Sequence, residues 1–111
     1  MANTFKNAAI SATGTVLTDA YTAGSGVTAT VIGLTCANVS STSPILVTIK
    51  FFDASANNTF HIVKEAQIFT GGALVAVGGD QKLVLETGDK IKVISNTAAS
   101  VDTIVSVMEQ S

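Results

Sequence analysis

Apolar and polar residues alternate most regularly in residues 78–95, which read GGDQKLVLETGDKIKVIS. The apolar members occupy every second position on both sides of a glycine turn: Leu83, Leu85, Ile91 and Val93. A period of two that continues across a short turn is typical of a β-hairpin. We therefore predict that two neighbouring strands turn these four side chains into a core.

The turn of this hairpin carries its own signals. Gly88 suits a turn position with a positive φ, and the Asp89 side chain can accept hydrogen bonds from the turn backbone. Four charged residues of the segment share the opposite face of the predicted hairpin, where they could form pairs across the two strands. They are Lys82, Glu86, Lys90 and Lys92.

Further β-rich runs alternate with clusters of glycine, serine, threonine, asparagine and aspartate. They predict strands at residues 14–22, 27–39, 45–52, 59–63, 73–77 and 101–108, with residues 64–67 as a polar connection. Residues 1–13 are expected to form an extended arm or an edge strand, and residues 14–111 the domain itself. About eight strands without a favoured helix indicate an all-β fold, a single antiparallel β-sandwich of jelly-roll or Ig-like type.

The longest predicted strand, residues 27–39, has apolar residues on both faces. Ile32, Leu34 and Cys36 share one parity, and we expect them to point inward. Gly33 interrupts the strand and suggests a β-bulge or a close backbone approach. A strand that is apolar on both sides lies in the middle of a sheet or at an interface.

Composition narrows the range of partners. The 111 residues carry a net charge of −2, and only 13% of them are charged against 47% hydrophobic. Six lysines and no arginine leave no basic footprint for nucleic acid. No apolar run approaches the roughly 20 residues of a membrane helix, and no secretory signal is expected. A surface so poor in charge suggests burial by other subunits, assembled in a reducing cytoplasm.

The residues suited to catalysis or metal binding are few. Cys36 and His61 are single, so a catalytic dyad is disfavoured and a zinc site lacks ligands. Residues 53–58, DASANN, resemble a calcium loop but lack its sixth-position glycine and its final glutamate, so we interpret them as a turn. We predict no catalytic residues, no metal and no cofactor.

The order of segments MANTFK, ATVIGLTCANVS, IVKEAQI and KLVLETGDKIKVIS, followed by TAASVD, resembles small virion structural proteins of tailed bacteriophages, especially those of cyanobacteria and marine bacteria. The resemblance implies a non-enzymatic β-sandwich of the virion. It favours a capsid decoration (cement) protein that binds the major capsid protein of an assembled shell as a homotrimer. The alternative is a neck, tail or tail-fibre component, including a receptor- or carbohydrate-binding module.

Position in the chain suggests which residues would reach neighbouring proteins. The N-terminal segment and two polar loops are the candidates, because loops and termini carry many binding contacts. The residues chosen are Phe5, Ile10, Ser25, Ser41, Thr42 and Pro44.

Overall fold

The computed structural model describes residues 3–40, 42–79 and 81–111. Ser41, one of the predicted interface residues, lies outside them. The regular elements of the described residues are nine strands: β1 (Asn3–Thr13), β2 (Thr18–Thr22), β3 (Thr28–Asn38), β4 (Ile45–Asp53), β5 (Asn58–Ile68), β6 (Ala73–Val77), β7 (Leu83–Leu85), β8 (Lys90–Ser95) and β9 (Val101–Gln110). No helix in this part of the chain has the length and apolarity of a membrane crossing.

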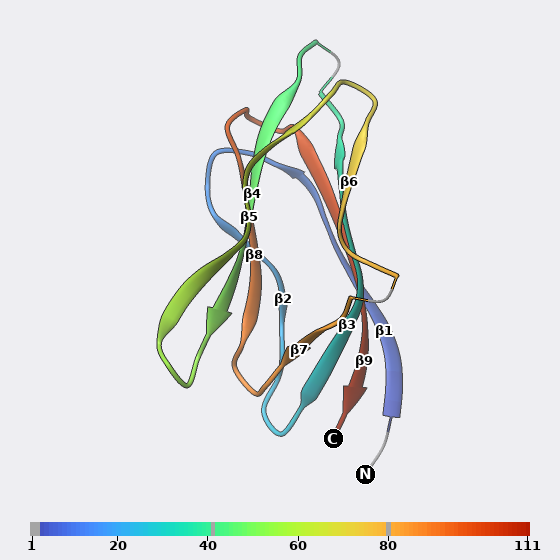
Figure 1. Ribbon diagram of the computed structural model, residues 1–111, viewed down its shortest axis with the longest axis vertical. Coiled ribbons are helices and arrows are strands. Elements are labelled where there is room, and N and C mark those ends of the chain that lie inside the picture. Colours follow the sequence, from blue (N-terminus) through green and yellow to red (C-terminus); the bar gives the residue numbers. More distant parts are fainter. Residues whose placement is uncertain (1–2, 41, 80) are drawn as a thin grey trace.

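The strands form two antiparallel sheets that face each other as the layers of a sandwich (Figure 1). Sheet A has the order β1-β9-β3-β6, and the short β7 also pairs with β3. Sheet B has the order β2-β8-β4-β5. The predicted all-β sandwich is confirmed, with nine strands where about eight were expected.

The pairing of strands identifies the sandwich as a jelly roll. If β7 is set aside, the first strand pairs with the last, the second with the next to last, β3 with β6, and β4 with β5. These four pairs alternate between the two sheets, and the contacts β3–β9 and β4–β8 join them. A long antiparallel hairpin wound into two sheets in this way is the jelly-roll arrangement.

The core fills the space between the sheets and draws on both of them. Sheet A contributes Val31, Leu34, Cys36, Leu85, Val101, Val105 and Val107, and sheet B contributes Ile45, Val47, Ile49, Ile91 and Val93. All of these side chains are at most 1% exposed. Each large aliphatic side chain removed from water stabilises the fold by about 1.5–3 kcal/mol.

The predicted hairpin in residues 78–95 is wrong as a strand pair. β7 pairs with β3 in sheet A, whereas β8 pairs with β2 and β4 in sheet B. The chain therefore crosses from one sheet to the other at this turn, since both strands find longer partners elsewhere. The four side chains predicted to point into the core do so: Leu85, Ile91 and Val93 are buried, and Leu83 packs against the core.

The turn itself has the predicted chemistry. Gly88 has a φ of 88°. The Asp89 carboxylate accepts hydrogen bonds from the backbone N–H groups of Glu86 and Ala54, both at 2.9 Å. Asp89 is 2% exposed, so it ties the crossing between the sheets to the β4–β5 turn. The expected charge pairs across the hairpin are absent from the described contacts, because Lys90 and Lys92 bind Asp19 of β2.

A β-bulge changes the facing of residues in β3. The register against β9 shifts between Val31 and Gly33, which confirms the bulge expected at this glycine. One extra residue reverses the alternation. Val31 is therefore fully buried and Ile32 is 38% exposed, so the predicted inward position of Ile32 is wrong. Leu34 and Cys36 lie beyond the bulge and are buried as expected.

A second bulge lies in β5, where the sequence suggested a polar connection at residues 64–67. These residues belong to the strand. Ala66 pairs with Val47 and Val63 pairs with Ile49, so two residues of β5 oppose Thr48 alone. Glu65 takes a φ of 51°, and its N–H donates to the Thr48 hydroxyl at 3.0 Å. The bulge allows polar residues to continue the strand.

Residues 53–58 form a turn, as predicted. The Asp53 carboxylate accepts hydrogen bonds from the N–H and hydroxyl of Ser55, at 3.1 and 2.8 Å, and from the N–H of Ala56 at 3.3 Å. The Asp53 side chain thus stabilises the turn in which it lies.

A polar contact joins the two sheets at the end where both termini lie (Figure 1). The Tyr21 hydroxyl of β2 donates a hydrogen bond to the Glu109 carboxylate of β9. Lys6 of β1 forms an ion pair with the same carboxylate at 3.1 Å. The bond from Tyr21, followed by that from Lys6, lowers the pKa of Glu109. Burial raises the pKa of Tyr21, so its hydroxyl keeps the proton that it donates.

Replacing Asp89 with alanine should lower the free energy of unfolding by about 1–3 kcal/mol, because two N–H groups lose their acceptor around a buried site. Urea denaturation measures the change. Asp53→Ala is the matched control, since its hydrogen bonds are exposed and water can replace them. Equal losses for the two variants would contradict a special role for Asp89.

The Glu109→Gln variant should show a stability deficit that depends on pH. A carboxylate whose pKa is lowered by folding stabilises the native state above its unfolded pKa of 4.5, and this contribution disappears as pH falls through the folded pKa. The deficit relative to wild type should therefore be full at neutral pH and vanish in acid. Urea unfolding across pH tests this, with exposed Glu86→Gln as the control. A deficit that is independent of pH would rule out the ionic tie.

Candidate functional site

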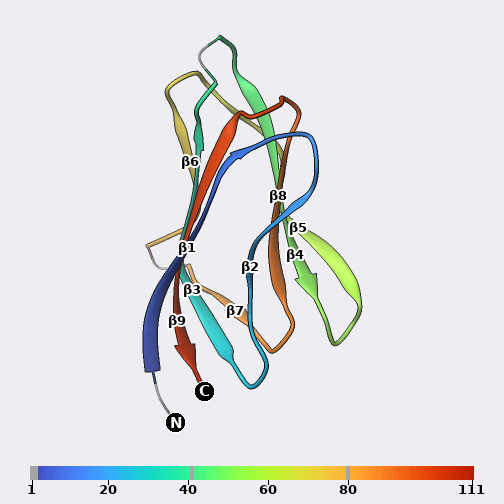
Figure 2. The ribbon, with the colours of Figure 1, turned by 180° about the vertical axis from the view of Figure 1, so that it is seen from behind.

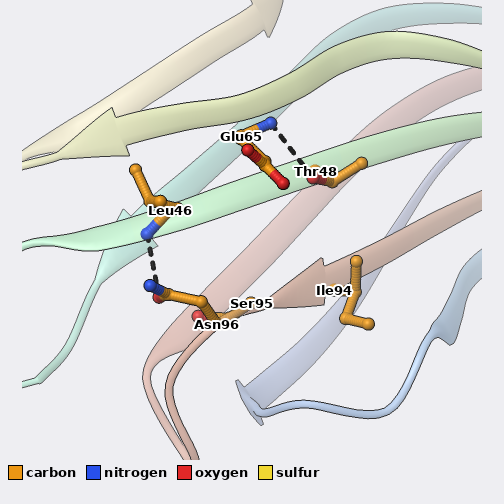
Figure 3. Close-up of a pocket in the computed structure, with 6 residues that line it drawn as sticks. All are labelled: Leu46, Thr48, Glu65, Ile94, Ser95 and Asn96. Atoms are coloured by element: carbon orange, nitrogen blue, oxygen red, sulfur yellow. Dashed lines mark hydrogen bonds between the residues drawn. The ribbon is translucent and has the colours of Figure 1, made fainter.

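A shallow depression lies on sheet B (Figure 3). Its volume is about 190 Å³, and it is lined by Leu46, Thr48, Glu65, Ile94, Ser95 and Asn96. Pockets that enclose small molecules usually measure about 300–1,000 Å³. Its polar groups serve the fold: the Glu65 N–H bonds Thr48, and the Leu46 N–H donates to the Asn96 side-chain oxygen at 3.0 Å. This depression does not form a catalytic site.

A second depression, of about 240 Å³, lies over β1 and β9. It is lined by Ala9, Ile10, Ser11, Asp102, Thr103 and Ile104, and it coincides with the shift of register between Ile10 and Thr13. Asp102 is its single ionisable residue. Within the described residues no group of three or more histidine, cysteine, aspartate or glutamate side chains could hold a metal ion.

Cys36 and His61 lie on different sheets. Cys36 is fully buried in β3, and its sulfur lies 3.5 Å from the Thr103 hydroxyl. Burial raises the pKa of the Cys36 thiol, which makes it a poor nucleophile. His61 is exposed in β5. The structure thus separates the two side chains that a cysteine–histidine dyad would require.

The outer face of sheet B carries a row of ionisable side chains, and Leu46, Phe52 and Ile94 also lie on this face. The strand registers place Asp19, Lys92, Lys50 and His61 in one row across its four strands. Asp19 accepts hydrogen bonds from Lys92 at 2.8 Å and Lys90 at 3.3 Å, and the bond from Lys92 is the main cause of its lowered pKa. Exposed ion pairs of this kind contribute only about 0–1 kcal/mol. Their main consequence is a hydrated surface.

The outer face of sheet A is different, and we name it the apolar face. Its rows follow from the registers of β1, β9, β3, β6 and β7. One row is Phe5, Met108, Thr30 and Val84, a second is Asn7, Ser106 and Gly33 beside Ile32, and a third is Ala9, Ile104, Thr35 and Val75. Asp102, at the end of the sheet, is the one ionisable member of these outward positions among the described residues.

Large side chains on the apolar face are exposed to solvent. Phe5 is 74% exposed, Val75 63%, Val84 55%, Ile104 54% and Ile32 38%. The residues between them in these rows are uncharged. An exposed apolar surface of this kind marks an interaction site more often than single exposed residues do. The apolar face is therefore the best candidate for a functional surface.

The residues predicted from position do not gather on one surface. Phe5 lies on the apolar face, whereas Ile10 is half-buried against the core. Ser25 lies exposed in the turn between β2 and β3. Thr42 and Pro44 are exposed before β4, at the opposite end of the sandwich (Figure 1). A role for these residues in binding remains a prediction.

Sequence reasoning missed most of the apolar face: Ile32, Val75, Val84 and Ile104. The available signal was the presence of apolar residues on both parities of residues 27–39. That signal indicated a mid-sheet or interface strand, and β3 is indeed flanked by β9 and by β6 and β7. The residues that point outward could not be identified from the sequence, because they depend on the position of the bulge in β3 and on which strands pair with it.

No protein-family model matches the sequence, and no curated protein matches it. Solved structures do resemble the fold. A structure of Bacillus endospore appendages, described as disulfide-linked pili, aligns with a TM-score of 0.58 and 14% identity over 98% of this chain and 88% of the other. The capsid of Helicobacter pylori bacteriophage KHP30 aligns with a TM-score of 0.55 and 13% identity over 98% and 87%.

A third structure, the viral particle of IBDV, aligns with a TM-score of 0.59 and 10% identity over 96% of this chain. The chain spans only 30% of the length of that viral protein. At these low identities the likeness establishes the fold alone. The chain has the jelly-roll-like sandwich that these capsid and appendage proteins share.

Proposed function

We propose that this chain is a non-enzymatic structural subunit of a bacteriophage particle, most specifically a decoration (cement) protein on the capsid. The observation that carries the proposal is the apolar face, a five-stranded surface with exposed Phe5, Val75, Val84 and Ile104 and hardly any charge. A monomer would leave this surface in water. A subunit of a multi-copy particle would cover it with its neighbours.

The fold supports the same class of role. Structures with a similar sandwich come from viral capsids and from spore appendages, all of which are assemblies of many copies. The charged outer face of sheet B complements this picture, because a subunit on a particle surface needs one face for its neighbours and another for solvent. The two sheets of this sandwich divide those tasks.

A decoration protein acts by contact, without turnover. Binding to the assembled shell but not to separated capsid subunits stabilises the shell by mass action. The major capsid protein is the proposed partner, a homotrimer the proposed form, and the virion the proposed location. The predicted contacts at Phe5, Ile10, Ser25, Thr42 and Pro44 belong to this proposal.

A carbohydrate-binding tail module has weaker support. Sugar sites usually offer an exposed aromatic platform. The chain has no tryptophan, and its single tyrosine, Tyr21, is half-buried with its hydroxyl committed to Glu109. Phe5, Phe60 and Phe69 are exposed, but Phe5 lies in sheet A and the other two lie at opposite ends of β5, so they do not form one platform. A neck or tail location with a purely structural role would use the same apolar face.

Adding charge to the apolar face should abolish shell binding without unfolding the chain. The double variant Val75→Lys/Ile104→Lys places two lysines in one row of sheet A, where both parent side chains are more than half exposed. Purified wild type should be oligomeric in light scattering and should sediment with shells of the particle whose genome encodes it. The variant should bind shells at least tenfold more weakly and form smaller oligomers than wild type, with an unchanged thermal transition.

Thr59→Lys/Gln67→Lys is the matched control, because it adds two lysines at exposed positions of β5 in sheet B. It should bind shells as wild type does. A stable wild-type monomer that ignores shells would remove the proposed function. Equal effects of the two lysine variants would show that net charge matters and the apolar face does not.

A further inference from the structure

The two sheets have four open edges, which differ in how well they are protected against pairing with another strand. β1 and β6, with β7, flank sheet A, and β2 and β5 flank sheet B. A strand at an edge presents unpaired backbone groups that another chain can join, so proteins usually guard such edges with short strands, bulges or charges. An edge that lacks such protection can add a strand from another chain.

Three of these edges are guarded. β2, β6 and β7 are five, five and three residues long, and the register of β2 shifts between Asp19 and Tyr21. β5 is longer, but its bulge at Glu65 and the neighbouring Lys64 interrupt its ladder. None of these edges offers a long regular template.

β1 is the least protected of the four edges. It spans 11 residues, contains neither proline nor glycine, and has Lys6 as its single charged residue. Its pairing with β9 is regular from Asn3 to Ile10, and its register shifts only beyond that point. Both ribbon views place the first half of this strand along the outer border of sheet A, with none of the described segments beside it on the free edge (Figures 1 and 2).

We propose that β1 pairs antiparallel with β1 of a second copy of this chain, across a two-fold axis that passes beside Asn7. This axis is perpendicular to the sheet, so side chains that point outward in one copy lie opposite outward side chains of the other copy. The regular segment, residues 3–10, can then be centred on residue 6 or residue 7. Centring on Lys6 would place two like charges directly opposite, which is unfavourable. Asn7 remains as the centre.

The side chains in this register complement one another in size. Phe5 lies opposite Ala9 of the partner copy on the outer side, and Lys6 lies opposite Ala8 on the inner side. On each side of the axis, a large side chain therefore lies opposite an alanine at two positions. Lys6 meets no second charge and keeps its ion pair with Glu109. The exposed Phe5 ring gains a neighbour across the junction.

The pairing makes the two A sheets continuous. Two five-stranded sheets would join into one of ten strands, and the two apolar faces would lie side by side on the same surface. This inference goes beyond the proposed function, because it requires only a second copy and no shell. A two-fold contact is also distinct from the three-fold contact of a trimer, so it would connect trimers or form dimers by itself.

Cysteine cross-linking tests the register. Directly opposite residues of an antiparallel pair have Cα atoms about 4.5–5.5 Å apart, within the span of about 4.4–6.8 Å that a disulfide needs. Under mild oxidation Asn7→Cys should form disulfide dimers by itself. Phe5→Cys and Ala9→Cys should each stay monomeric on denaturing gels and form dimers only when mixed, since positions 5 and 5 would lie about 14 Å apart. The native Cys36 is fully buried and does not interfere.

Ser106→Cys is the matched control, because Ser106 is the β9 partner of Asn7 in the same row of the apolar face. It should not cross-link through the edge. Absence of dimers for Asn7→Cys, or of mixture-specific dimers for Phe5→Cys with Ala9→Cys, would overturn the proposal. Equal cross-linking at Ser106 would also overturn it, since the faces and not the edges would then meet.

A charge exchange gives a second readout that needs no oxidation. In sedimentation velocity Asn7→Asp and Asn7→Lys should each form smaller species than wild type, because the two-fold contact is lost. An equal mixture should recover the wild-type species, because opposite charges then meet across the axis. Failure of the mixture to recover would count against the pairing. The two proposals can fail separately: Val75→Lys/Ile104→Lys should leave the Asn7→Cys cross-link intact while abolishing shell binding.

Discussion

Burial of the two inner sheet faces against each other is the interaction on which this structure depends. The strands at the centre of the two sheets, β9 with β3 and β8 with β4, carry most of the fully buried side chains. β9 comes last in the chain and lies between β1 and β3. Its partners are remote, as in the pairing of Gln110 with both Asn3 and Thr28. The sandwich therefore closes only when contacts of great sequence separation form, which costs loop entropy and slows folding.

The sequence predicted the class of the fold because alternation is a local property. Strand positions, the turn at residues 53–58, and the roles of Gly88 and Asp89 depend on neighbours a few residues away. Strand partners do not. β7 and β8 look like a hairpin in sequence, yet the apolar inner faces are better covered when they pair with β3 and β4 in different sheets. Ile32 failed for a related reason, since one inserted residue at Gly33 reverses every inward assignment before it.

The candidate surface was harder to foresee than the core. An inward residue is apolar because it lies in the core. An outward apolar residue indicates a binding surface only when its neighbours on the adjacent strands are known. Phe5, Ile104 and Val75 are far apart in the chain and share a face only through the registers of β1, β9, β3 and β6. The low charge content suggested an interface somewhere on the surface. The strand registers show that the outward apolar residues lie on sheet A and the lysine row on sheet B.

The apolar face and the β1 edge share Phe5 but point in different directions, and this affects how copies could assemble. A contact through the face stacks a partner above the sheet, whereas a contact through the edge extends the sheet in its own plane. One does not obstruct the other, so a single copy could use both at once. The edge pairing would also enlarge the face contact, since two apolar faces that lie side by side offer a partner twice the area without ordering another subunit. The outer face of sheet B, the apolar face and the β1 edge thus point in three different directions. In the proposed assembly they would contact solvent, the shell and a second copy of the chain, respectively.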